Sequence, residues 1–213
     1  MKTKSKVKEK KVSLTYGVGV YDIDEPTETK IDGERVRDPY YIKWQDMLKR
    51  CYSDKYQAKS PTYVGCSVCE EWLTFSNFKK WMEKQKWEGK HLDKDIIKEG
   101  NKIYSPETCM FVEGYINKLF IDTASNRGDC PLGVCINKRR RIKKYNAQIR
   151  KYGKNHHLGY YATAEEASLV YQRAKFEYVK EIAQNLNPED EDPRLIPSLK
   201  RWLINKRDEL NKQ

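Results

Sequence analysis

The chain has 213 residues, of which 42 are Lys or Arg and 31 are Asp or Glu, giving a formal net charge of +11. This length can bury one core or two small ones, and the 15 Tyr and 5 Trp favour folded domains over a disordered polymer. There is no run of about 18 apolar residues and no secretory signal, which excludes a spanning helix and export. We therefore expect no membrane partner, a cytoplasmic protein and six reduced cysteines.

The positive charge is concentrated in two segments. Residues 131–163 hold nine Lys or Arg and no acidic residue, and residues 1–11 hold six Lys against one Glu. Such a field attracts a polyanion, so nucleic acid is the expected partner. The lysine-rich start predicts a disordered arm, and residues 22–39 predict a loop or extended segment. Residues 1–39 thus form a basic arm and an extended lead-in.

Residues 40–122 are expected to form a first module that begins with two helices. Apolar residues recur at three- and four-residue spacing from Trp44, which predicts one face of a helix. A second helix is expected from about Ser76 to Gln85, and the turn between the helices contains Cys66-Ser-Val-Cys69. The residues expected to be buried on these helices are Trp44, Met47, Leu48, Cys51, Tyr52, Phe75, Phe78, Trp81 and Met82.

The first module is expected to end in a hairpin followed by a helix. A short alternating stretch, His91 to Ile96, is followed by a loop at 99–101 and a second extended piece at 109–112. A helix through Ile116 to Phe120 completes the module. Residues 121–131, with Gly and Pro, predict the boundary to the next one.

Residues 130–185 are expected to form a second module, a three-stranded antiparallel sheet packed on one helix. Apolar and polar side chains alternate over residues 144–150, as in a strand with one buried face. Flanking strands are expected at about 132–137 and 156–161. Basic turns, including residues 138–141, join the strands.

The helix of this module is expected to begin with a capping box, in which Thr163 and Glu166 satisfy free backbone N–H groups. Residues 186–213 predict a loop and a short last helix. The fold class is therefore α+β. The stripe expected to pack on the sheet contains Ala167, Val170, Tyr171, Ala174, Tyr178 and Ile182.

One helix covers only one face of a three-stranded sheet, so the other face meets solvent or a ligand. The DNA major groove admits such a ribbon, with Lys and Arg on phosphates and Asn, Gln and Arg on base edges. Two alternatives are a basic face that binds nothing and a face that binds RNA, whose deep, narrow groove suits a ribbon less well. The residues expected to contact DNA are Lys138, Arg139, Arg140, Arg141, Lys143, Lys144, Asn146, Gln148, Arg150, Lys154 and His157.

Within residues 131–185, several positions match a known pattern: Gly133-Val134, Tyr145 to Ile149, Leu158 to Tyr161, Thr163 to Ala167, Tyr171 and Ala174. Taken in order, they resemble the APETALA2-type DNA-binding domain. The resemblance implies a sheet that lies in the major groove, with contacts from the basic turn and the central strand. His157 stands where the family often has Trp, and a histidine can still donate a hydrogen bond.

A hairpin and a following helix, with Asn in the loop and on the helix, form a layout by which a one-metal nuclease holds a divalent ion against the scissile phosphate. Three features of this segment, Leu92 to Ile96, Gly100-Asn101 with Ser105-Pro-Glu107, and Asn117, resemble the HNH endonucleases, in particular phage homing-type ones. The resemblance implies Mg or Mn as the cofactor. It assigns Asp93 or Asp95 on the first strand, together with Asn117 on the helix, to the metal. The candidate catalytic residues are His91, Asp93, Lys94, Asp95 and Asn101.

The resemblance departs from the family at the general base. The histidine that usually follows the first-strand acid is Lys94 here, and the nearby histidine is His91. His91 would share a strand face with Asp93 and Asp95 and could substitute; otherwise the site is inactive. In the structural alternatives, the two Asp residues balance neighbouring lysines and Asn117 is a helix-surface amide.

Cys66 and Cys69 have the spacing of zinc ligands, and Cys109 or Cys51 could complete a tetrahedral thiolate shell in space. No second pair with this spacing occurs. Buried free thiols are therefore the simpler interpretation.

The sequence thus predicts a phage-type, homing-endonuclease-like protein that acts in the host-cell cytoplasm. An HNH-like module would cleave or nick duplex DNA with a divalent metal, and the second module would set where the protein binds. The opposing hypothesis is a catalytically degenerate protein that acts as a DNA-binding regulator or host-interaction protein. The sequence does not fix the target site or the oligomeric state.

Overall fold

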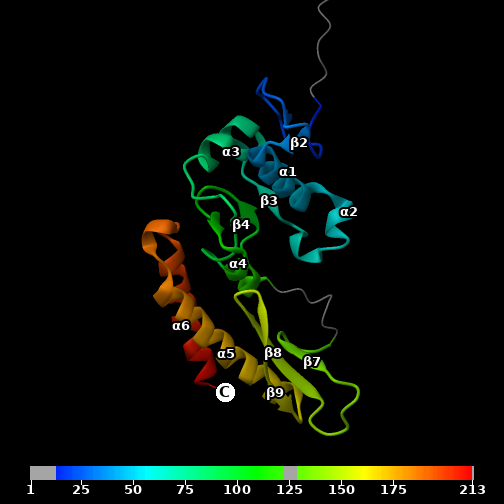
Figure 1. Ribbon diagram of the computed structural model, residues 1–213, viewed down its shortest axis with the longest axis vertical. Helices are drawn as coiled ribbons and strands as arrows, with labels where there is room; N and C mark the ends of the chain where they lie inside the picture. The colour runs from blue at the N-terminus through cyan, green and yellow to red at the C-terminus, as the bar shows by residue number, and fades with distance from the viewer. Residues whose placement is uncertain (1–12, 122–128, 213) are drawn as a thin grey trace, which may run out of the picture. The chain divides into compact units, whose positions relative to one another are not determined.

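The computed structural model describes residues 13–121 and 129–212 (Figure 1). The expected mixed α+β class is confirmed, because the described ranges contain six α-helices and a three-stranded antiparallel sheet. The expected basic arm, and most of the boundary predicted at 121–131, lie outside the described residues. Within the described ranges, no helix has the length and apolar character needed to cross a membrane.

The chain divides into two compact units. We call residues 13–85 with 101–108 the N-terminal unit, and residues 86–100 with 109–212 the C-terminal unit. The hairpin and helix of the expected first module therefore group with the C-terminal unit.

The N-terminal unit is built on helices α1 (Pro39–Tyr52) and α3 (Phe75–Met82). Asp38 caps α1, since its Oδ1 accepts the backbone N–H of Tyr40 at 2.7 Å. The helical prediction from Trp44 is confirmed, and the Trp44 indole, fully buried, donates to the Trp72 carbonyl at 2.7 Å. Shorter helical pieces are α2 (Asp54–Gln57), η1 (Pro61–Tyr63) and η2 (Glu70–Leu73).

Two strand pairs of this unit were not expected from the sequence. β1 (Glu28–Ile31) and β2 (Glu34–Arg37) form an antiparallel hairpin within the predicted lead-in, and all eight of their residues are exposed. β3 (Ser67–Val68) pairs in parallel with β5 (Ile103–Tyr104). Asp32 and Gly33 both have positive φ at the turn of the hairpin, which is the geometry that an Asp-Gly pair favours.

In the C-terminal unit, β4 (His91–Asp93) pairs antiparallel with β6 (Met110–Val112), and α4 (Gly114–Phe120) follows. His91 lies opposite Val112 and Asp93 lies opposite Met110. Met110, Val112 and Ile116 belong to the main core of this unit. The expected first strand, His91 to Ile96, is too long, because regular pairing stops at Asp93.

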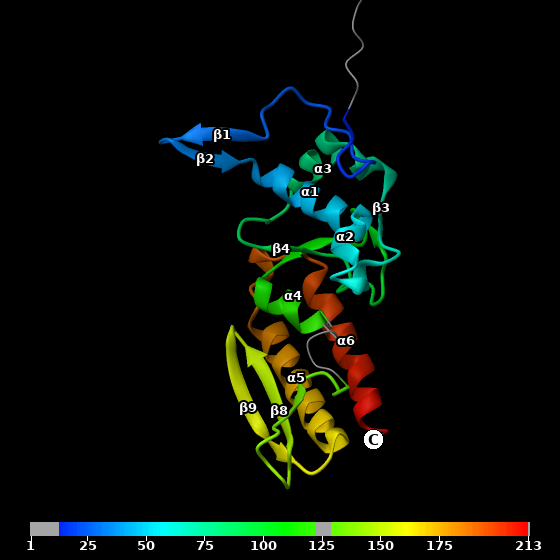
Figure 2. The ribbon, with the colours of Figure 1, turned by 90° about the vertical axis from the view of Figure 1, so that its right-hand side faces the viewer.

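The sheet of the C-terminal unit has the order β7-β8-β9 and is antiparallel throughout, as expected. Its strands are β7 (Val134–Ile136), β8 (Tyr145–Lys151) and β9 (Lys154–Tyr161). Figure 2 shows β8 and β9 lying along α5 (Ala164–Asn185). Gly133 has φ of 77° and the Tyr171 ring of α5 occupies the place where a Cβ would stand, so only Gly fits there.

The capping box of α5 is present in slightly altered form. The Thr163 Oγ1 accepts the Glu166 N–H at 3.1 Å, and the Glu166 carboxylate accepts the Ala162 N–H at 3.2 Å, one residue before the expected donor. After η4 (Pro188–Asp190), α6 (Leu195–Leu210) packs on α5. Leu195 and Leu199 therefore join the core that contains Tyr178 and Ile182.

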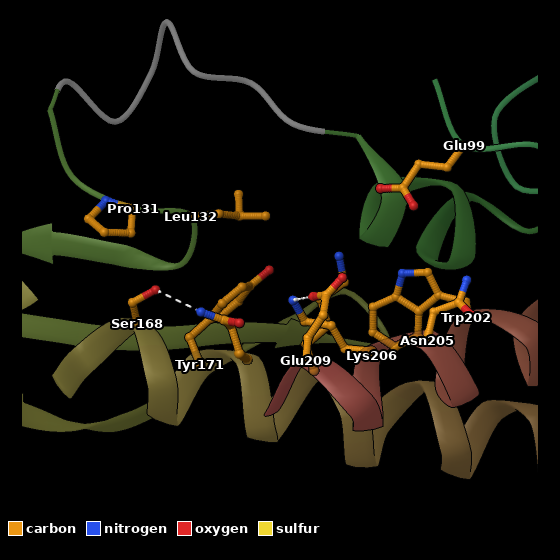
Figure 3. A pocket seen from close by; sticks show the side chains of 11 residues that line it. Glu99, Pro131, Leu132, Ser168, Tyr171, Trp202, Asn205, Lys206 and Glu209 are labelled. Atoms are coloured by element: carbon orange, nitrogen blue, oxygen red, sulfur yellow. Dashed lines mark hydrogen bonds and ion pairs between the residues drawn. The ribbon is translucent and has the colours of Figure 1, made fainter. Parts of the chain in front are cut away.

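A cavity of about 360 Å³ lies between α5 and α6 (Figure 3). Its polar lining is largely self-paired, because Lys206 contacts Glu209 at 2.6 Å and Gln172 donates to Ser168 at 3.2 Å. It lies on the helical side of the sheet, so it is no part of the face that the sequence assigns to DNA.

Candidate functional site

The face of β7–β9 turned away from α5 is the first candidate site, which we call the open face. Along β8, Ala147 and Ile149 are buried, whereas Gln148 and Arg150 are exposed. The register places Gln148 opposite His157, and Arg150 opposite Asn155. The open face therefore carries amide, imidazole and guanidinium groups side by side, as the alternation in the sequence predicts.

A β-bulge keeps these side chains on one face. Ala147 pairs with Gly159 and Gln148 pairs with His157, so Leu158 has no direct partner on β8. Leu158 turns towards the core instead. Because a bulge adds one residue to one strand, His157 and Tyr160 lie on the open face although three positions separate them.

The turn between β7 and β8 is the second part of this surface. Lys138 to Lys144 are all exposed, and none of their six cations pairs with a carboxylate in the described part of the chain. Asn137 closes the turn by donating its N–H to the Lys144 carbonyl at 2.8 Å. An unpaired cationic turn beside an open strand face is suited to binding a polyanion.

Tyr160, which the sequence analysis did not single out, holds one of these cations. The Arg140 guanidinium lies 3.9 Å from the centre of the Tyr160 ring, and the His157 ring lies 4.6 Å from it on the same strand. The sequence signal for Tyr160 was its place in the strand alternation, but the contact with Arg140 depends on how the turn folds back.

Not every residue expected to contact DNA is equally available. Asn146 is half-buried, its amide nitrogen donates to the Cys135 sulfur at 3.5 Å, and its Oδ1 is buried without a partner in the described chain. Arg150 uses its Nε for the Gly153 carbonyl at 2.9 Å, which leaves both terminal nitrogens for a ligand. Lys154 and His157 are exposed on β9.

Asp93, the central residue of the candidate hydrolytic site, is 6% exposed at the end of β4. Its Oδ1 accepts the N–H groups of Asp95 and Ile96, both at 2.8 Å, so the side chain forms a turn that ends the strand. Burial raises the pKa of Asp93 to about 6, although the two N–H donors act in the opposite direction. Its second oxygen has no hydrogen-bond partner among the described residues.

The neighbours of Asp93 are arranged differently from the sequence expectation. Asp95 lies beyond the strand, so it does not share a strand face with His91, and its carboxylate accepts two contacts from the buried Lys94 ammonium at 2.7 and 2.8 Å. His91 is exposed, and its ring lies beside Gly114, the first residue of α4. A Cβ atom added to Gly114 would stand 3.1 Å from the His91 Nε2. Asn117 is half-buried on α4, and its side chain makes no hydrogen bond within the described ranges.

Asn101 belongs to the N-terminal unit and not to the unit that contains Asp93. It is buried, its amide donates to the Ile103 carbonyl at 2.6 Å, and its Oδ1 accepts the Ile103 N–H at 3.3 Å. The side chain thus shapes the start of β5.

Among the described residues, the structure brings together no group of acidic, His or Cys side chains that could hold a metal ion. All six cysteines are free thiols, and no three His, Cys, Asp or Glu side chains in the described ranges come together as ligands. Cys66 and Cys69 flank β3 in the N-terminal unit, whereas Cys109 belongs to the C-terminal unit. Burial raises the pKa of the Cys69 thiol, so the protonated thiol is favoured in the metal-free protein.

Comparison with known proteins adds no identification: no family model, curated protein or solved structure matches the chain.

Proposed function

We propose that this protein binds duplex DNA through the open face and the basic turn of the C-terminal unit, and that β4, β6 and α4 form a metal-dependent, HNH-type endonuclease site. The observation that supports DNA binding best is the combination of Gln148, Arg150 and His157 on one exposed face with six unpaired cations beside it.

A two- or three-stranded ribbon can enter the major groove, where each base pair presents a distinct pattern of donors and acceptors. Gln148 has the paired donor and acceptor that match adenine, and Arg150 has the paired donors that match guanine. The turn cations other than Arg140 would contact phosphates, which contribute affinity and register but little sequence preference. Arg140, held against the Tyr160 ring, would reach a base edge.

The nuclease proposal rests on the hairpin followed by a helix, with Asp93 at the end of the first strand and Asn117 on the helix. Mg²⁺ is commonly held through one or two carboxylates and completed by phosphate and water oxygens. The unpartnered oxygen of Asp93 fits such a role, whereas Asp95 would first have to separate from Lys94. The bound ion would neutralise charge on the scissile phosphate.

The chain's own groups would then orient water and move its proton. His91 is exposed beside the start of α4 and is the candidate base that accepts the proton of the attacking water. Lys94 holds the Asp95 carboxylate and is therefore a positioning residue in this scheme.

A second candidate function is DNA binding without cleavage. It is favoured by the Lys94–Asp95 contact, which occupies a proposed metal ligand, and by the two backbone N–H groups that occupy one oxygen of Asp93. In this case the hairpin and helix would serve only as a scaffold for the sheet.

Supercoiled plasmid and a short labelled duplex distinguish these functions. With Mg²⁺ or Mn²⁺, the wild-type protein should convert plasmid to the open-circular form, and the Asp93→Ala, Asp95→Ala double variant should not, while both bind the duplex with similar affinity. Binding without cutting by the wild type would support the second candidate. Equal cutting by both proteins would overturn the assignment of the site, and no binding by the wild type would overturn both functions.

A further inference from the structure

A second cavity of the C-terminal unit, of about 230 Å³, lies between α4, β8 and α5. Lys118 and Tyr115 of α4 line one side, Arg150 of β8 lines another, and Leu119, Ile149 and Tyr171 supply apolar surface. Pockets for free small molecules usually measure about 300 to 1,000 Å³. This cavity is smaller, so it suits one part of a larger ligand.

The donors that α4 contributes to the cavity have no partner among the described residues. The Lys118 ammonium and the Tyr115 hydroxyl make no hydrogen bond or ion pair in the described part of the chain. Arg150 donates a hydrogen bond from its Nε alone, to the Gly153 carbonyl. Burial is the main cause that raises the pKa of Tyr115 to about 12, so its hydroxyl stays protonated and can donate at neutral pH.

No carboxylate lines the cavity, whereas two cations, Lys118 and Arg150, do. An anion bound there would be attracted by both charges. Arg150 also belongs to the open face, so the cavity adjoins the surface on which DNA would lie.

We propose that this cavity binds a backbone phosphate of the DNA, with Lys118, Arg150 and Tyr115 as donors and the apolar wall against the adjoining deoxyribose. The inference rests on the proposed DNA binding. It adds a contact from α4, the helix that carries Asn117, and so brings one strand of the duplex to the candidate hydrolytic site.

The test compares Lys118→Gln with Lys200→Gln, a matched loss of one exposed charge on α6, by measuring duplex affinity from 50 to 300 mM salt. Lys118→Gln should lower the slope of log Kd against log salt by about 1, and Lys200→Gln should not. Ethylation interference should lose one phosphate position in Lys118→Gln and in Tyr115→Phe, which keeps the ring that packs on Tyr152.

Circular dichroism and melting temperatures of the three variants should match the wild type, so that a changed slope reports binding and not folding. Equal slopes for the two lysine variants, with an unchanged interference pattern, would overturn the phosphate site while leaving DNA binding intact. A wild-type protein that does not bind duplex DNA at all would overturn the proposed function and this inference together.

Discussion

The carboxyl group of Asp93 lies at the end of β4 with its pKa raised to about 6 by burial. In an unfolded chain the pKa of Asp is about 4, so folding favours the protonated acid. The resulting contribution to stability is complete below about pH 4 and is lost as the pH rises through 6. At neutral pH the folded protein therefore carries an ionised Asp93 at a cost of about 3 kcal/mol.

We expect Asp93→Asn to raise the free energy of unfolding by about 1 to 3 kcal/mol at pH 8 and to change it little at pH 4. The amide oxygen of Asn can still accept both backbone N–H groups, so the turn should survive. Urea unfolding at the two pH values measures the difference. Asp95→Asn is the control, because that half-exposed carboxylate is paired with Lys94 and its loss should not stabilise the protein at pH 8.

If Asp93→Asn stabilised the protein equally at both pH values, removal of a buried charge would not be the cause of the stabilisation. A gain in stability accompanied by loss of plasmid cutting would instead indicate a carboxylate retained for function at the expense of stability.

Among elements, the contact between the basic turn and β9 determines where Arg140 points. Tyr160→Leu removes the ring under the guanidinium but keeps an apolar side chain, whereas Tyr160→Phe keeps the ring. We expect Tyr160→Leu to reduce the preference for a selected duplex over a scrambled one by about tenfold, because a fixed Arg gains about 1 to 3 kcal/mol from the correct base. Tyr160→Phe should retain the preference.

Competition binding with a duplex selected from a random library measures that ratio. Arg141→Gln serves as the comparison, since loss of an exposed cation that is proposed to contact phosphate should weaken binding to both duplexes equally. An unchanged ratio in Tyr160→Leu would mean that Arg140 contacts only phosphates.

Periodicity predicted the elements that bury a face, and missed those that do not. α1, β8 and α5 follow their apolar patterns closely, and the Thr163 cap was readable from one hydroxyl and one carboxylate. The β1–β2 hairpin buries nothing, so only the Asp-Gly turn marked it. The parallel pairing of β3 with β5 joins residues that are far apart in the sequence, so no local sequence pattern could predict it.

The sequence indicated which residues belong to the candidate site, but not how their side chains are arranged. The order of Asp93, Asp95 and Asn117 could be read from the sequence. The hydrogen bonds from backbone N–H groups to the Asp93 carboxylate, which end β4, could not be read from it. Because of these hydrogen bonds, Asp95 lies beyond the strand, where its carboxylate pairs with the Lys94 ammonium.

For the whole molecule, the distribution of charge should decide how the proposed affinity for DNA responds to salt. Residues 131–163 contribute nine positive charges and no negative ones to a net charge of +11, and six of these cations stand unpaired on one turn. Each phosphate neutralised releases condensed counterions, so log Kd should rise linearly with log salt. With about six phosphate contacts, raising salt from 50 to 200 mM should weaken binding about a thousandfold.

Fluorescence anisotropy of a labelled duplex measures this slope. Replacing Arg139, Arg141 and Lys143 together with Gln should lower the slope by about 3, whereas replacing Lys200, Arg207 and Lys212 should leave it nearly unchanged, although both triple variants lose the same net charge. Equal effects would mean that net charge alone attracts DNA. A selective effect of the turn would mean that the chain holds the duplex where Gln148 and Arg150 can reach its bases.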